Sequence, residues 1–180
     1  MSIANRLQKY IADRQLPWDC VSHEPSGSCM EAAHRAHVPP DRVAKAVVLE
    51  GRGGYLMAVL PANHHLDVED LGEALSDDFA LVSEARLGGL FADCRPGAVP
   101  PVGAAYGIRT IWDEGLGRRA DVYFEAGDHE TLVHMRRPNG DTIVARVAPE
   151  YNVQTGETLE LAVETEHIHA FEPETEQAII

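Results

Sequence analysis

The chain has 180 residues, a formal net charge of −14 at pH 7 and three widely spaced cysteines. This length suits one domain with a sizeable core, and the acidic balance argues against a broad non-specific nucleic-acid surface. The odd cysteine count argues against a disulfide framework and a zinc site, and no apolar run is long enough to span a membrane, so we expect a protein of the reducing cytoplasm.

Periodic apolar residues, together with capping residues, predict helices in the first half of the chain. Ser28-Cys29-Met30-Glu31 is a capping box, with serine at the cap and glutamate three residues later. Ser2, Asp67 and Ser83 are expected to cap other helices. The predicted helices cover residues 2–14, 28–36, 67–75 and 83–90.

Short apolar runs separated by turn residues predict strands along most of the chain. They cover residues 16–24, 43–49, 55–60, 79–82, 108–112, 120–125 and 131–135. The second and third of these should pair as a hairpin across 51–54. No phosphate-binding glycine fingerprint and no Walker motif is present. We therefore expect an α+β fold with a mixed, largely antiparallel sheet and flanking helices.

The last part of the chain differs in character. Residues 138–141 read as a turn, and residues 142–147 and 158–164 as strands. Segments 156–161 and 167–175 faintly resemble the end of the small β-barrel that follows some ABC transporter ATPases. We expect a main domain over residues 1–137 and a small C-terminal β-rich extension over 138–180, added to that domain as extra strands.

Lys45 is the one charged residue in the apolar run Val43–Leu49. Strand alternation places it on the face that carries Val43, Val47 and Leu49. A buried ammonium is costly without an anionic partner, so we expect this lysine to face a cleft. The alternative is an edge or end position from which the amine reaches water.

The segment Gly97-Ala98-Val99-Pro100-Pro101-Val102-Gly103 predicts a stiff loop. Proline fixes φ and removes a donor, and glycine permits close approach of another group. Such a loop exposes backbone N–H groups only at chosen places. It is either a rigid connector or a preformed cradle for a carbonyl or an anion.

Metal ligands and nucleophiles are weakly represented. His64 and His65 are adjacent, and neighbouring residues point apart; His167 and His169 share a predicted strand face. Cys94 has no histidine near it in sequence, which favours a structural role. We expect no metal and no cofactor.

The order of these pieces is similar to the YbaK/ProX family of aminoacyl-tRNA deacylases, which is related to the editing domain of bacterial prolyl-tRNA synthetases. The resemblance is carried by the lysine strand Ala44–Leu49, the loop Gly97–Pro101, a strand that ends at Asp113, and Phe124-Glu125-Ala126-Gly127-Asp128-His129. It covers roughly residues 1–137. The departures from the common family pattern are Ala46 after the lysine and Ala98 in the loop.

The resemblance implies an enzyme that hydrolyses mischarged aminoacyl-tRNA in trans and takes its general base from the substrate. It implies Lys45, Gly97 and Pro101 as catalytic residues. It also implies a substrate-binding set, consisting of Ala46, Ala98, Val99, Pro100, Gly127 and His129. The expected partners are the acceptor end of a mischarged tRNA and an aminoacyl-tRNA synthetase, with no DNA and no membrane.

Two other readings remain open at this point. The acidic charge favours a non-catalytic binding module of the same fold, for a small anion or a protein partner. A hydrolase of free amino-acid esters is the third. A panel of mischarged tRNAs separates the three readings.

Overall fold

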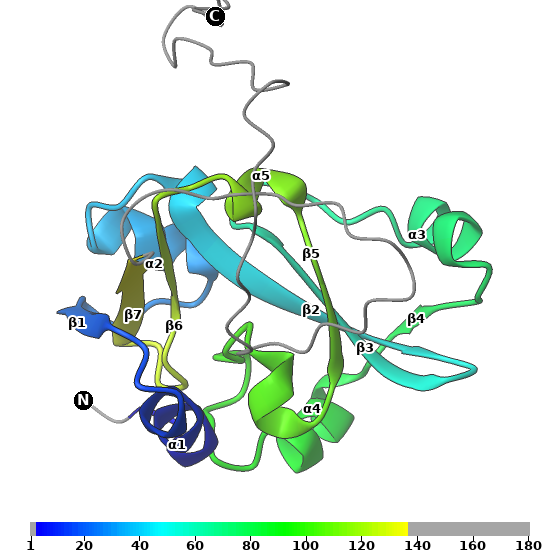
Figure 1. Cartoon of the computed structure of the whole chain (residues 1–180), viewed down its shortest axis with the longest axis horizontal. Helices are drawn as coiled ribbons and strands as arrows, with labels where there is room; N and C mark the ends of the chain where they lie inside the picture. The colour runs from blue at the N-terminus through cyan, green and yellow to red at the C-terminus, as the bar shows by residue number, and fades with distance from the viewer. Residues whose placement is uncertain (1–2, 137–180) are drawn as a thin grey trace, which may run out of the picture. The chain divides into compact units, whose positions relative to one another are not determined.

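The computed structural model describes residues 3–136, and the turn and strands predicted in 138–180 lie outside them. Within this range helices and strands are interspersed along the chain (Figure 1). The α-helices are α1 (Asn5–Asp13), α2 (Cys29–Arg35), α3 (Val68–Leu75), α4 (Glu84–Leu90) and α5 (Glu114–Gly117), with 3₁₀ turns η1 (Pro40–Arg42) and η2 (Gly103–Tyr106). The strands are β1 (Trp18–Ser22), β2 (Val43–Gly51), β3 (Gly54–Pro61), β4 (Ala80–Leu81), β5 (Arg109–Trp112), β6 (Asp121–Glu125) and β7 (Thr131–Arg136).

The strands of the described residues form one mixed sheet in the order β1-β7-β6-β2-β3-β5, and β4 pairs with β2. The pairings β1–β7, β6–β7, β2–β3 and β2–β4 are antiparallel, whereas β2–β6 and β3–β5 are parallel. This confirms the predicted α+β fold with a largely antiparallel sheet. The central position of β2 matters most for the site. Because β6 and β3 lie on either side of β2, Lys45 is in the interior of the sheet and not at an edge.

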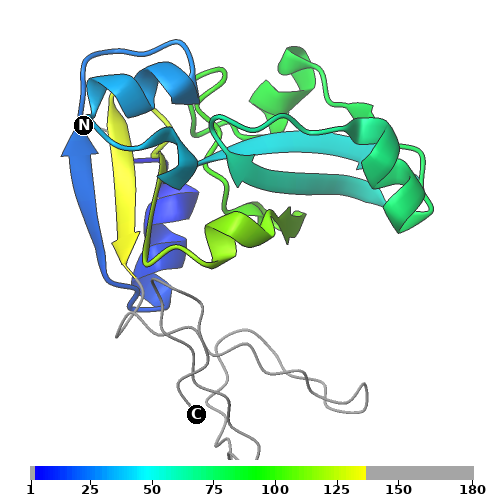
Figure 2. The same cartoon turned by 90° about the horizontal axis from the view of Figure 1, so that it is seen from above.

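The predicted hairpin is present and is the longest pairing in the sheet. Its register runs from Ala44 opposite Pro61 to Gly51 opposite Gly54. Gly54 has φ +101°, a conformation that a glycine adopts readily in a tight turn. Figure 2 shows β2 and β3 side by side, extending toward α3.

The two faces of the sheet bury different clusters. On one face Leu7 and Ile11 of α1 pack with Ala44, Val48 and other residues of the central strands. On the opposite face α2 packs over Val43 through its alanines, and α3 packs over Leu49. Lys45 shares this second face by strand alternation, so α2 and α3 flank it.

The caps follow the sequence only in part. The Ser28 side chain accepts a hydrogen bond from the Glu31 N–H at 3.2 Å, and Asp67 caps α3, as predicted. The Ser2 prediction is wrong: α1 begins at Asn5 with Ala4 as N-cap, so the serine lies too far ahead of the helix. Ser83 precedes α4, but its side chain makes no cap hydrogen bond. No helix in residues 3–136 has the length and apolar character needed to cross a membrane.

Candidate functional site

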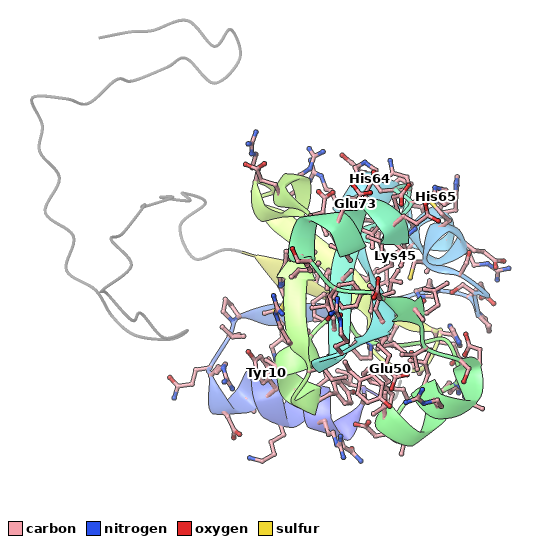
Figure 3. The ribbon with its side chains drawn as sticks, turned by 90° about the vertical axis from the view of Figure 1, so that its right-hand side faces the viewer. Tyr10, Lys45, Glu50, His64, His65 and Glu73 are labelled. Carbon is pink, nitrogen blue, oxygen red and sulfur yellow. The ribbon has the colours of Figure 1, made fainter. Side chains whose placement is uncertain are left out.

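Lys45 is partly buried in the middle of the sheet. Its Nζ donates to the carbonyl oxygen of Ala62 at 3.0 Å and to that of His64. In Figure 3 Lys45 lies just below the segment that carries His64 and His65. An ammonium has three donors, so these two carbonyls fix the amine and leave one N–H for another group. The structure thus gives the Lys45 amine two defined partners, which are carbonyl oxygens and not an anion. That this lysine faces a cleft stays a prediction.

Glu125 ends the strand β6, which pairs with the start of β2. The parallel register pairs Val43 with Tyr123 and Ala44 with Phe124, so Lys45 and Glu125 are the residues that follow the last printed pair on the two strands. Cys29 of α2 lies over both positions. Burial raises the pKa of its thiol to about 12; the charge of Glu125 adds to this rise and that of Lys45 opposes it. At neutral pH the thiol is therefore protonated and a poor nucleophile.

His129 follows β6 in a tight turn. Its backbone has φ +63°, a left-handed conformation, and Ser26 holds its carbonyl through a backbone hydrogen bond of 3.1 Å. The ring reaches in two directions: Nε2 lies 2.7 Å from the carbonyl oxygen of Pro96, and Nδ1 lies 3.8 Å from Oε1 of Glu125. His129 therefore connects the buried acid to the glycine-proline loop.

The loop itself is rigid and mostly buried. Ala98, Pro100 and Pro101 are buried, whereas Gly97 is exposed with φ +85°. The Ala98 N–H donates to the Arg95 carbonyl at 3.0 Å. Within residues 3–136 the N–H groups of Gly97 and Val99 have no hydrogen-bond acceptor. The loop therefore retains backbone donors at chosen places, as a cradle for an oxygen requires.

Several residues of the expected substrate-binding set support the loop instead of lining a large cavity. Ala46 and Val99 pack on the α1 face of the sheet, opposite Lys45. The hollow that Val99 lines beside α4 measures only about 10 Å³. The Gly127 carbonyl accepts from the Arg95 N–H at 2.8 Å, which anchors the start of the loop. Their roles in binding stay predictions.

A larger hollow of about 200 Å³ lies along β3 and β5. It is lined by Leu60, the cross-strand partner of Lys45, and by His64, Trp112 and Asp113 among others. His64 Nδ1 lies 3.5 Å from Asp113 Oδ2, and Trp112 is 53% exposed. The sequence prediction missed this hollow. The adjacent aromatic and acid at the end of β5 are the signal that could have indicated it.

Metal ligands do not converge in the part of the chain that the structure describes. Across residues 3–136, no three histidine, cysteine or carboxylate side chains are arranged to hold an ion. His64 and His65 thus have no third ligand among these residues, and His167 and His169 lie outside them. The absence of a metal requirement stays a prediction.

Residues 23–141, more than half of the chain, match the model of the aminoacyl-tRNA editing domain family. The chain belongs to this family. The matched range contains Lys45, the Gly97 loop, Glu125 and His129, so the pieces of the candidate site all lie in this editing domain.

Solved structures agree on the fold of the editing domain. One is described as "a putative trans-editing enzyme for prolyl tRNA synthetase"; it is 20% identical, covers 74% of this chain and 85% of its own, and has a TM-score of 0.62. A crystallised "hypothetical protein" is 22% identical, covers 73% and 89%, and has a TM-score of 0.65. Both establish a YbaK-like fold. No curated protein matches the chain significantly.

Proposed function

We propose that this editing domain hydrolyses the ester bond that joins a wrong amino acid to the terminal ribose of a tRNA. The observation that carries the proposal is the arrangement of Lys45. Its amine is fixed by the carbonyls of Ala62 and His64, keeps one N–H for a ligand, and lies within the family match. A fixed cation beside an apolar sheet face suits a substrate that brings negative charge.

In the reaction a water adds to the ester carbonyl carbon and gives its proton to a base. The carbonyl oxygen becomes an oxyanion; then the bond to the ribose oxygen breaks and that oxygen takes a proton. An aminoacyl ester is already activated, so positioning the water and stabilising the oxyanion supply most of the catalysis. We assign the base to the substrate itself, as the family resemblance implies.

Lys45 and the loop then have separate tasks. The remaining N–H of Lys45 binds the terminal phosphate of the tRNA or supports charge in the transition state. The unpaired N–H groups of Gly97 and Val99 receive the ester carbonyl and its oxyanion. Backbone donors in a stiff loop need no reorganisation during the reaction, which is why such groups stabilise an oxyanion well.

The test is a deacylation panel. Purified protein is mixed with tRNAs that carry radiolabelled wrong amino acids, and the release of each amino acid is followed against the uncatalysed rate. Correctly charged tRNAs are the controls. We expect acceleration for one or a few mischarged pairs and none for their correct counterparts.

A second candidate is a binding module without hydrolysis. The net charge of −14 favours it, because tRNA affinity depends on basic contacts with phosphates. This candidate predicts that no tRNA in the panel is deacylated, while a small anion or a protein partner binds the wild type and loses affinity on Lys45→Ala.

A further inference from the structure

Glu125 is a buried acid without a hydrogen-bonded partner. It is 2% exposed, and within residues 3–136 neither carboxylate oxygen makes a hydrogen bond. The His129 backbone N–H points toward the carboxylate and favours its charged form, but its geometry falls short of a hydrogen bond. An unpaired buried carboxylate is costly, so its retention at the end of a central strand calls for an explanation.

Two histidines act on this carboxylate through their charge, and each has a buried nitrogen that also lacks a partner. Nδ1 of His129 and Nε2 of His23 are buried and make no hydrogen bond among the described residues. The charges of both rings act on Glu125 and favour its ionised form. Each ring binds a backbone carbonyl through its other nitrogen, since His23 Nδ1 lies 2.7 Å from the Glu24 oxygen and His129 Nε2 lies 2.7 Å from the Pro96 oxygen.

The two carbonyls determine where the protons are. A carbonyl oxygen only accepts, so His129 Nε2 and His23 Nδ1 must each carry a hydrogen. When the ring of His129 is neutral, its Nδ1, which lies 3.8 Å from Glu125 Oε1, is therefore an acceptor. An ionised carboxylate is also an acceptor, so Glu125 and the neutral ring of His129 cannot bond to each other. One additional proton, on Glu125 Oε1 or on His129 Nδ1, supplies the missing donor.

The surroundings of Glu125 favour retention of that proton. Burial raises the pKa of Glu125; the charges of His129 and His23 oppose the rise, and that of Asp128 adds to it. Among the described residues, Cys29 of α2 also interacts with the charge of Glu125, and Lys45 of β2 acts on the same thiol. A group held in low dielectric keeps its neutral form to higher pH, or shares its proton with a base.

We propose that Glu125 is a positioning residue of the editing site: one proton, carried by Glu125 or by His129, makes the 3.8 Å approach of Oε1 to Nδ1 attractive and so keeps the ring oriented with Nε2 on the Pro96 carbonyl. That bond fixes the entry to the Gly97 loop, whose backbone donors receive the substrate oxygen. Ser26 holds only the backbone carbonyl of His129, whereas the ring is held by Pro96 on one side and faces Glu125 on the other. The proton between Glu125 and His129 adds to the Pro96 contact in selecting one orientation of the ring.

The effect on catalysis rests on the proposed hydrolysis, whereas the effect on the ring does not. The experiment therefore has two readouts: the ¹⁵N chemical shifts of the His129 ring across pH, assigned by their loss in His129→Gln, and the rate of deacylation. The variants are Glu125→Gln, whose amide can donate to Nδ1 without titrating, and Glu125→Ala, which has no donor. Glu50→Gln, at an exposed ion pair with Arg86, is the matched control.

We expect a protonated Nε2 in the wild type and in Glu125→Gln, and a mixture of ring states in Glu125→Ala. We expect kcat of Glu125→Gln to stay within about threefold of wild type with a flatter pH profile, and that of Glu125→Ala to fall by on the order of 10-fold with a smaller change in KM. Glu50→Gln should match wild type in both readouts.

The outcomes separate the two proposals. Wild-type ring shifts and pH profile in both Glu125 variants would overturn the positioning role. If Glu125→Ala does not fold, Glu125→Gln alone decides, because an unchanged His129 titration in that variant would equally overturn it. The expected ring shifts without any deacylation by the wild type would leave Glu125 as a positioning residue and contradict the hydrolytic function.

Discussion

Gly97 and His129 are neighbours in space although 32 positions separate them in sequence: a Cβ on Gly97 would lie 3.5 Å from Cε1 and Nε2 of the imidazole. This is ordinary van der Waals contact, so the ring leaves room for a methyl group. The constraint on Gly97 is its φ of +85°, which L side chains adopt poorly. The glycine is thus required by the shape of the backbone more than by space.

Gly97→Ala should reduce deacylation because it moves the loop out of its left-handed conformation, and with it the free N–H groups. The strain is about 1–2 kcal/mol, and if the loop relaxes we expect a rate loss of roughly 10-fold or more. Gly53→Ala in the β2–β3 turn is the matched control, since a Cβ there meets nothing within 4 Å. Equal rates for the two variants, measured on the same mischarged tRNA, would argue against a role for the loop.

Local sequence signals were sufficient for most of the fold. Apolar runs located β2 and β3, the glycine-rich turn between them fixed their pairing, and the capping box at Ser28 placed the start of α2. The short elements α5 and η2 were not predicted, because one turn of helix carries too little periodic signal. Ser2 failed as a cap because the backbone hydrogen bond from Ala4 N–H to the Ala126 carbonyl fixes where α1 begins.

The candidate site depended on tertiary information that single strands do not carry. Lys45 stood out because a charge interrupts an apolar run, but its carbonyl partners follow the end of β3 and are set by pairing. Glu125 looked like the polar end of a strand. It is buried because β6 lies between β7 and β2 and because α2 covers that face, a fact that only the order of strands supplies.

The free energy of unfolding should depend on pH because Glu125 is buried. The pKa of Glu125 is raised above its ordinary value of 4.5, chiefly by burial, so the folded protein keeps this proton to higher pH than the unfolded chain does. Between pH 4.5 and the raised pKa, unfolding releases a proton, and the free energy of unfolding falls as pH rises.

Glu125→Gln removes this titration, so its stability relative to wild type should increase from about pH 4.5 upward and level off above the raised pKa. Urea unfolding of both proteins at unit steps from pH 4 to pH 8 measures the difference. Parallel stability curves over the whole range would show that Glu125 titrates alike in the folded and unfolded chain.

Chelation should not affect the reaction. The described residues contain no metal-binding cluster, and the proposed mechanism needs only Lys45 and backbone donors. Dialysis against EDTA, followed by assay in metal-free buffer, should leave the deacylation rate unchanged. A loss of activity that zinc restores would instead direct attention to His64, His65, His167 and His169.

The most direct test of the account is the deacylation rate of Lys45→Ala on the best mischarged tRNA of the panel. Loss of one charged contact in the transition state costs a few kcal/mol, so we expect a fall of roughly 10²-fold or more. Lys9→Ala, at an exposed ion pair with Asp13 on α1, is the control and should keep the wild-type rate. Thermal melts exclude unfolding, and Lys45→Met retains the length of the side chain if alanine destabilises the sheet. A near wild-type rate for a folded Lys45 variant would contradict the assignment of this lysine to the reaction.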